Sequence, residues 1–224
     1  LGDVYKRQTL YNKWEGDSLK IVQMIKKLNN TELGKGGTHD TYVLVPNDLD
    51  ISDIFDTPGA VIDFVDKQRG NHVGLRNTVG REKRIVGLGQ YYRENDLSAG
   101  DEIIFERVES GDNIRYFITI QKYDESLVVQ KSKYGFEILT PERLAYFNEI
   151  CQNAGALVEI NFVTAEKKRN DSPEETNFYD ILVNGTSLLS SCGGKEIKEL
   201  YLSGRNLRVI SFYGWKKYAY EMED

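Results

Sequence analysis

Six residues between positions 76 and 84 carry side chains whose chemistry matches the edges of DNA bases. Arginine and lysine donate to O6 and N7 of guanine, glutamate accepts from N4 of cytosine, and asparagine pairs with adenine. On an extended strand, neighbouring side chains point to opposite faces, so all of them can face the bases only if the strand lies edge-on or bends at Gly80. The six candidates for base reading are Arg76, Asn77, Arg81, Glu82, Lys83 and Arg84.

A second segment, the loop GKGGTHDT at positions 34–41, combines glycines with polar side chains. Glycines at 34, 36 and 37 allow the backbone to approach a phosphate closely, so that its N–H groups serve as donors. The candidate DNA-contacting residues of this loop are Lys35, Thr38, His39, Asp40 and Thr41.

Charge is distributed unevenly around these segments. The whole chain has a net charge of −6, which argues against indiscriminate coating of nucleic acid. Residues 67–93 nevertheless contain seven Lys or Arg against the single acid Glu82, while six aspartates precede them between positions 48 and 66. The basic stretch predicts phosphate contacts, which position a protein on DNA without adding sequence preference. The candidates for phosphate contact are Lys67, Arg69 and Arg93 in this stretch, together with Lys26 from an earlier strand.

Plainer interpretations of the same residues stay open. The run REKR is also typical of a solvated edge strand whose charges discourage aggregation. The loop around His39 can equally be a mobile turn, with His39 partly buried and holding it by hydrogen bonds. That interpretation suits His72 better, because His72 belongs to neither segment.

The composition predicts a mainly β protein. Fourteen Tyr, nine Phe and only four Pro accompany many short β-branched or aromatic runs, which favour strands. A helix is expected over 141–153, where Thr140 precedes Pro141 and apolar residues recur at core spacing. A short helix is expected at GQYYREND, with Tyr91 and Tyr92 packing onto the sheet.

Two motifs in the expected order resemble the N-terminal effector domain of EcoRII-type restriction endonucleases. IKKLNNTELGKGGTHDTYVLVP contributes Ile25 to Leu28, Gly34, Gly37, His39 and Pro46, although Thr38 stands where the family has a second glycine. GREKRIVGLG, at 80–89, is similar to the second hallmark of that family. LSAGDEIIFER is similar to a hairpin of the related B-three domains of plant transcription factors.

This resemblance implies a seven-stranded open pseudobarrel with short helices, whose two arms grip the major groove of double-stranded DNA. The arms would be the GKGGTHDT loop and the region from Arg76 to Arg84. We expect the pseudobarrel domain at 18–140 and a small α+β or β unit at 141–224. Residues 1–8, LGDVYKRQ, resemble a translated adapter and are excluded from the fold. The implied role is the effector or target-recognition part of a restriction-modification system.

Two other function classes compete with a DNA reader. A complete nuclease needs carboxylates that hold Mg²⁺ and a nearby lysine, and Asp180, Glu196 and Lys198 have that form. Because Glu-x-Lys is common in a chain with 29% charged residues, a solvated surface is the simpler interpretation. The other alternative is a β domain that binds protein or sugar. The clustered charge argues against it.

The remaining expectations concern partners, cofactors and location. Double-stranded DNA is the expected partner, and a nuclease domain or subunit and a second copy of the chain are further ones. DNA binding needs no cofactor, and Mg²⁺ enters only with a nuclease unit. Cys151 and Cys192 form no metal-binding pattern, and no apolar run is long enough for a membrane helix, so the cytosol is the expected location.

Overall fold

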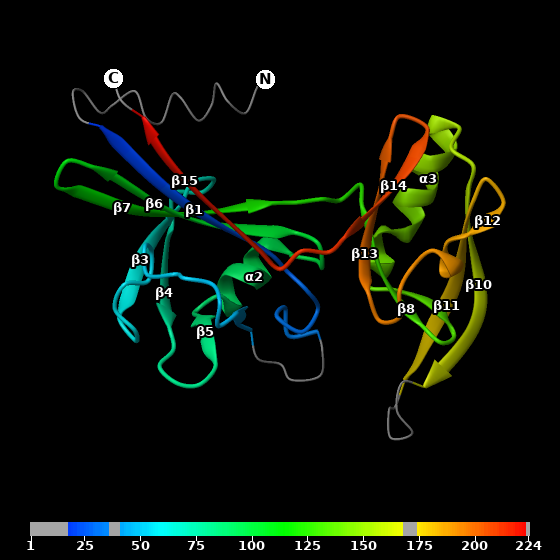
Figure 1. The fold of residues 1–224 in the computed structure, drawn as a ribbon, viewed down its shortest axis with the longest axis horizontal. Helices are drawn as coiled ribbons and strands as arrows, with labels where there is room; N and C mark the ends of the chain where they lie inside the picture. The colour runs from blue at the N-terminus through cyan, green and yellow to red at the C-terminus, as the bar shows by residue number, and fades with distance from the viewer. Residues whose placement is uncertain (1–17, 36–40, 168–173, 223–224) are drawn as a thin grey trace.

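The computed structural model describes residues 18–35, 41–167 and 174–222 (Figure 1). Within them the chain is mainly β, as its composition predicts. It forms a strongly curled, open half-barrel sheet and a second antiparallel sheet, together with two short α-helices.

The first sheet has eight strands in the order β15-β1-β6-β7-β3-β4-β5-β2. All neighbours are antiparallel except β3 and β7, which run parallel. The resemblance implied seven strands, and the order includes β15 from the far end of the chain. The strands are β1 (Leu19–Lys27), β2 (Val43–Val45), β3 (Val61–Asp66), β4 (His72–Asn77), β5 (Lys83–Val86), β6 (Glu102–Ser110), β7 (Asn113–Gln121) and β15 (Trp215–Met222).

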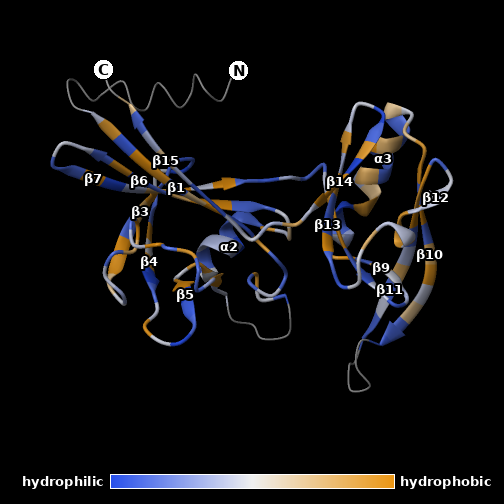
Figure 2. Cartoon of the chain, in the orientation of Figure 1, coloured by the Kyte–Doolittle hydropathy of each residue, from blue (hydrophilic) through white to orange (hydrophobic). Residues whose placement is uncertain are grey.

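The curl of this sheet encloses a core of alternating apolar residues. Met24, Phe64, Leu75, Ile85 and Phe105 are buried on its inner face, and the strands accordingly show hydrophobic and hydrophilic bands in Figure 2. Helix α2 (Gly89–Asn95) closes the interior with two buried tyrosines, positions 91 and 92. The expected packing of these tyrosines is confirmed.

Side chains bridge the two open edges of the half-barrel. Trp215 of edge strand β15 donates from Nε1 to the carbonyl oxygen of Leu44 in edge strand β2, at 2.9 Å. Lys217 donates to the carbonyl oxygen of Asp50 at 2.9 Å and forms an ion pair with Asp53. These contacts hold the β2 edge in place without continuous strand pairing.

The second sheet follows the order β10-β11-β9-β8-β13-β14, with β12 paired to β11. Helix α3 (Leu144–Ala154) packs on it through Phe147 and Cys151, after the 3₁₀ turn η1 (Pro141–Arg143). The helix predicted over 141–153 therefore begins as a 3₁₀ turn. The other elements are β8 (Leu127–Ser132), β9 (Gly135–Ile138), β10 (Val158–Lys167), β11 (Glu175–Val183), β12 (Thr186–Ser187), η2 (Leu188–Ser190), β13 (Ile197–Ser203) and β14 (Asn206–Ser211).

The chain crosses between the sheets twice. It enters the second sheet between β7 and β8 and returns to the first between β14 and β15 (Figure 1). The hydrogen-bonded sheets therefore divide near residue 122 and again near 214, whereas the domain boundary expected at 140 stays a prediction.

Buried ion pairs join the two sheets. Lys27 of β1 lies 2.5 Å from Glu199 of β13 and 3.5 Å from Glu102 of β6. Arg143 of η1 donates to Asp101, which precedes β6, at 2.8 Å. Because breaking such a pair leaves an uncompensated buried charge, these contacts fix how the sheets meet.

A second buried pair anchors the turn between β1 and β2. Glu32 lies 3.0 Å from Nζ of Lys26 and accepts from the backbone N–H groups of Asn29 and Leu44. Burial raises the pKa of Glu32, and the Lys26 charge opposes that rise. The carboxylate thus ties the turn that follows β1 to the start of β2.

Glu32→Ala is expected to lower the free energy of unfolding by about 3–5 kcal/mol, because the Lys26 ammonium stays buried without its partner. Urea unfolding followed by circular dichroism measures this loss. The control is Glu221→Ala, which removes an exposed pair to Lys20 and is expected to cost less than about 1 kcal/mol. Equal losses in both variants would contradict the anchoring role of Glu32.

Candidate nucleic-acid interface

The two predicted arms adjoin one pair of neighbouring strands. β2 pairs with β5 in an antiparallel register that sets Leu44 opposite Arg84 and Val45 opposite Lys83. Thr41, the last residue of the GKGGTHDT loop, comes shortly before β2 at one end of this pair, and residues 78–82 lead into β5 at the other end. The described end of the loop and the 78–82 turn therefore lie at opposite ends of the same short ribbon.

The connection between β4 and β5 is a closed turn. Thr78 donates from its backbone N–H to the carbonyl oxygen of Arg84 at 2.8 Å, and Oγ1 of Thr78 accepts from the Arg84 N–H at 3.0 Å. Gly80 has a φ of +146°, a conformation that residues with a Cβ rarely adopt. The turn leaves Val79, Arg81 and Glu82 exposed.

Arg84 is held between an aromatic ring and a carboxylate. Its guanidinium carbon lies 4.1 Å from the ring centroid of Tyr42, and its Nε donates to Oε2 of Glu82 at 2.8 Å. Glu82 and Arg84 share one face of the strand, as the alternation of an extended strand predicts. Stacking on Tyr42 and pairing with Glu82 orient the planar group in the free protein.

Basic side chains also surround the described ends of the GKGGTHDT loop. Lys35 donates to the carbonyl oxygen of Leu97 at 3.1 Å. Thr41 and Arg93 both approach Gly89, where a Cβ atom would lie 2.7 Å from Oγ1 of Thr41 and 3.5 Å from Nη1 of Arg93. Thr38, His39 and Asp40 lie outside the described residues.

The other predicted base readers differ in exposure. Arg76 is exposed on β4, and Lys83 is half-buried on β5. Asn77 is only 5% exposed, and its backbone carbonyl oxygen accepts from the N–H of Gly59. A buried amide cannot reach a base from this strand, so Asn77 is left out of the contact surface.

The predicted phosphate contacts divide into two pairs. Arg69 and Arg93 are exposed beside α2, where Arg69 donates to the carbonyl oxygen of Glu94 at 3.0 Å. Lys26 is buried against Glu32, and Lys67 pairs with the buried Glu106 of β6. Lys26 and Lys67 therefore serve the packing of the sheet.

His72 does hold a hydrogen bond, but in an exposed position. Its Nδ1 lies 2.6 Å from Oδ2 of Asp63 on the neighbouring strand β3, and about two thirds of its side chain is exposed. The prediction that His72 is partly buried is wrong, because β3 and β4 turn this face toward solvent.

The three residues considered for a nuclease are not brought together. Asp180 lies on β11 and accepts from Ser187 at 2.6 Å, whereas Lys198 lies on β13 and pairs with Glu196 at 2.8 Å. Two strands separate β11 from β13, which corresponds to about 14 Å at ordinary strand spacing. In the described ranges, no three His, Cys, Asp or Glu side chains cluster as a metal site.

Two residues of the interface had no signal in the sequence. Tyr42 follows the predicted loop but becomes significant only because β2 pairs with β5 and sets its ring beside Arg84. Trp215 lies far along the chain and supports the β2 edge from β15. Both contacts depend on long-range strand order.

The fold and the interface define a mainly β protein built on a curled, open half-barrel. Among solved structures, the N-terminal domain of Helicobacter pylori LlaJI.R1 is similar at a TM-score of 0.33 and 15% identity, over 45% of this chain and 81% of that one. The hypothetical Arabidopsis thaliana protein At1g16640.1 is similar at a TM-score of 0.31 and 17% identity, over 46% and 92%. These scores are too low to carry an argument about function.

No family model matches the chain, and no curated protein does either. None of the helices in the described ranges is long and apolar enough to cross a membrane.

Thr78→Val is expected to loosen the β4–β5 turn, because it removes the hydroxyl that accepts from the Arg84 N–H. The free energy of unfolding is expected to fall by about 1 kcal/mol, and the Arg84 amide to exchange its hydrogen faster. Hydrogen exchange read by NMR measures the second effect. Thr186→Val, at an exposed position on β12, is the matched control and is expected to leave Arg84 exchange unchanged.

Proposed function

We propose that this chain binds double-stranded DNA sequence-specifically through the major groove, as the effector or target-recognition part of a restriction-modification system. The observation that carries the proposal is the pairing of β2 with β5, which sets the ends of both predicted arms beside one ribbon. The two motifs that resemble EcoRII-type effector domains are its second support.

The dimensions of the ribbon suit a groove. Three paired positions span about 7–10 Å between the two arms, and the major groove of B-DNA is about 12 Å wide. A two-stranded ribbon is an established way to enter that groove. We therefore assign the two arms to the walls of the major groove and the ribbon to the floor of the groove.

The side chains on and beside the ribbon have separate chemical roles in this proposal. Arg81, Lys83 and Arg84 donate to guanine, and Glu82 accepts from cytosine once Arg84 turns to the base edge. Tyr42 stacks on the Arg84 guanidinium. Arg69 and Arg93 contact phosphates and fix the register of the protein on the duplex.

Selection of bound duplexes from a random library tests the proposal directly. The full chain is incubated with the library at two salt concentrations, with and without Mg²⁺, and bound and cleaved products are sequenced. Enrichment of one short motif without Mg²⁺ is the expected result. Binding of all sequences alike would overturn sequence reading, and cleavage with Mg²⁺ would identify a nuclease.

Arg84→Ala and Lys83→Ala are each expected to weaken binding to the selected duplex by about 1–3 kcal/mol and to relax its sequence preference. The loss arises because guanine O6 and N7 lose their donors. Fluorescence anisotropy with selected and scrambled duplexes measures both effects. Arg208→Ala, an exposed arginine on β14 of the second sheet, is the matched control and is expected to bind both duplexes as the unchanged protein does.

Arg69→Ala is expected to weaken selected and scrambled duplexes to the same extent and to reduce the salt slope of binding by about one unit, because one phosphate contact is lost. Titrations at several salt concentrations measure the slope. A loss confined to the selected duplex would instead assign Arg69 to base reading.

A further inference from the structure

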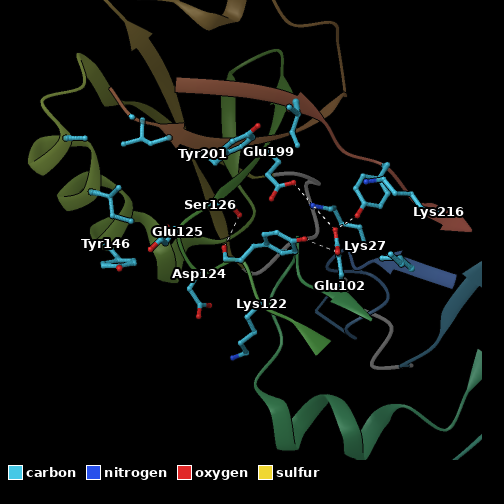
Figure 3. Close-up of a pocket in the computed structure, with 18 of the residues that line it drawn as sticks. Lys27, Glu102, Lys122, Asp124, Glu125, Ser126, Tyr146, Glu199, Tyr201 and Lys216 are labelled. Atoms are coloured by element: carbon cyan, nitrogen blue, oxygen red, sulfur yellow. Dashed lines mark hydrogen bonds and ion pairs between the residues drawn. The ribbon is translucent and has the colours of Figure 1, made fainter. Parts of the chain in front are cut away.

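A cleft of about 960 Å³ lies where the two sheets meet (Figure 3). Side chains of β1, β6, α3, β13, β14 and β15 and of the link between β7 and β8 line it. Its volume falls within the range of small-molecule sites in proteins. The residues of the proposed DNA surface do not line it.

The floor of the cleft is polar but already satisfied. Lys27 is paired with Glu199 and Glu102, and its Nζ lies 4.6 and 4.9 Å from the ring centroids of Tyr123 and Tyr213. Both tyrosine hydroxyls donate to Glu102. Burial, and secondarily the negative Glu102, raises the pKa of both tyrosines, so they stay protonated. A ligand on the floor therefore meets tyrosine rings beside one ammonium group and two carboxylates whose polar atoms already have partners.

The walls of the cleft expose aromatic rings from three separate elements. Tyr146 on α3, Tyr201 on β13 and Tyr218 on β15 line the cleft and are 47%, 37% and 41% exposed. Figure 3 shows Tyr146 and Tyr201 projecting from separate elements. Tyrosine rings grouped in this way offer stacking surfaces for a flat ligand.

The rim carries both signs of charge in equal number. Lys122 and Lys216 stand there with Asp124 and Glu125; Lys122 donates to the carbonyl oxygen of Asp96 at 2.9 Å, and Asp124 lies 3.7 Å from Arg143. A ligand recognised by phosphate alone would meet as many carboxylates as ammonium groups, and a quaternary ammonium would meet the two lysines. A planar ring with donors and acceptors on its edge is complementary to both signs.

We propose that this cleft binds a nucleobase, stacked on Tyr201 and Tyr218 and hydrogen-bonded at its edge by the charged rim. Base stacking on aromatic side chains and edge recognition by polar groups are the interactions that hold an unstacked base in a protein. The base can belong to a free nucleotide or to a single-stranded segment. This inference does not rest on duplex reading by the β2–β5 ribbon.

Calorimetric titration of the full chain tests the proposal with four probes: adenosine monophosphate, cytidine monophosphate, a four-nucleotide single-stranded DNA and ribose 5-phosphate. Saturable binding of at least one base-containing probe is expected, and none of ribose 5-phosphate. A tighter complex with the oligonucleotide would assign the base to a single strand, and a tighter complex with a mononucleotide to a free nucleotide.

The variants Tyr201→Ala and Tyr218→Ala are each expected to weaken that binding about tenfold, because a stacking surface is lost. Tyr201→Phe keeps the ring and is expected to bind as the unchanged protein does, which separates stacking from misfolding. Phe162→Ala, at an exposed ring on β10 outside the cleft, and Arg84→Ala on the DNA surface are expected to change nothing.

Three results would overturn the nucleobase site. They are the absence of saturable binding by every base-containing probe, binding of ribose 5-phosphate as tight as that of the nucleotides, and unchanged binding in both alanine variants. Loss of duplex binding in Arg84→Ala with intact nucleotide binding would show the two sites to be independent.

Discussion

The arrangement of the two sheets depends on a lysine that is removed from water. Lys27 is almost fully buried, and a buried ammonium is stable only with close partners. Glu199 comes from the second sheet and Glu102 from the first, and two tyrosine hydroxyls satisfy the remaining acceptors of Glu102. This charge in β1, together with the Arg143–Asp101 pair, therefore helps to fix where β13 lies and the shape of the cleft between the sheets.

The candidate DNA surface, by contrast, is built on short strands. β2 and β5 have three and four residues, the fewest in the described part of the first sheet. Few ladder hydrogen bonds hold them, so Glu32, Trp215 and Lys217 supply the missing support through side chains. Glu32 and Trp215 thereby occupy the backbone N–H and the carbonyl oxygen of Leu44, on the edge of β2 that faces away from β5.

Much of the local structure was predictable because it follows from neighbouring residues. The alternation in β6 and β7, the helix after Thr140 and the tyrosines of α2 all depend on periods within about ten residues. Charge and exposure were less predictable. Lys26 and Asn77 have the side chains of DNA contacts, yet their strands turn them inward, since a period of two cannot tell which face of a sheet meets the core.

The sequence by itself determined the mainly β class, the positions of the turns and the concentration of basic residues between 67 and 93. Only the tertiary structure decided that β2 lies beside β5, that Tyr42 stacks on Arg84, that Asp180 is remote from Lys198 and that five tyrosines share one cleft. The physical reason is the separation along the chain over which each kind of interaction acts. Turn chemistry and strand period act between neighbours, whereas the β2–β5 pairing and the buried ion pairs between the sheets join residues from about forty to 172 positions apart.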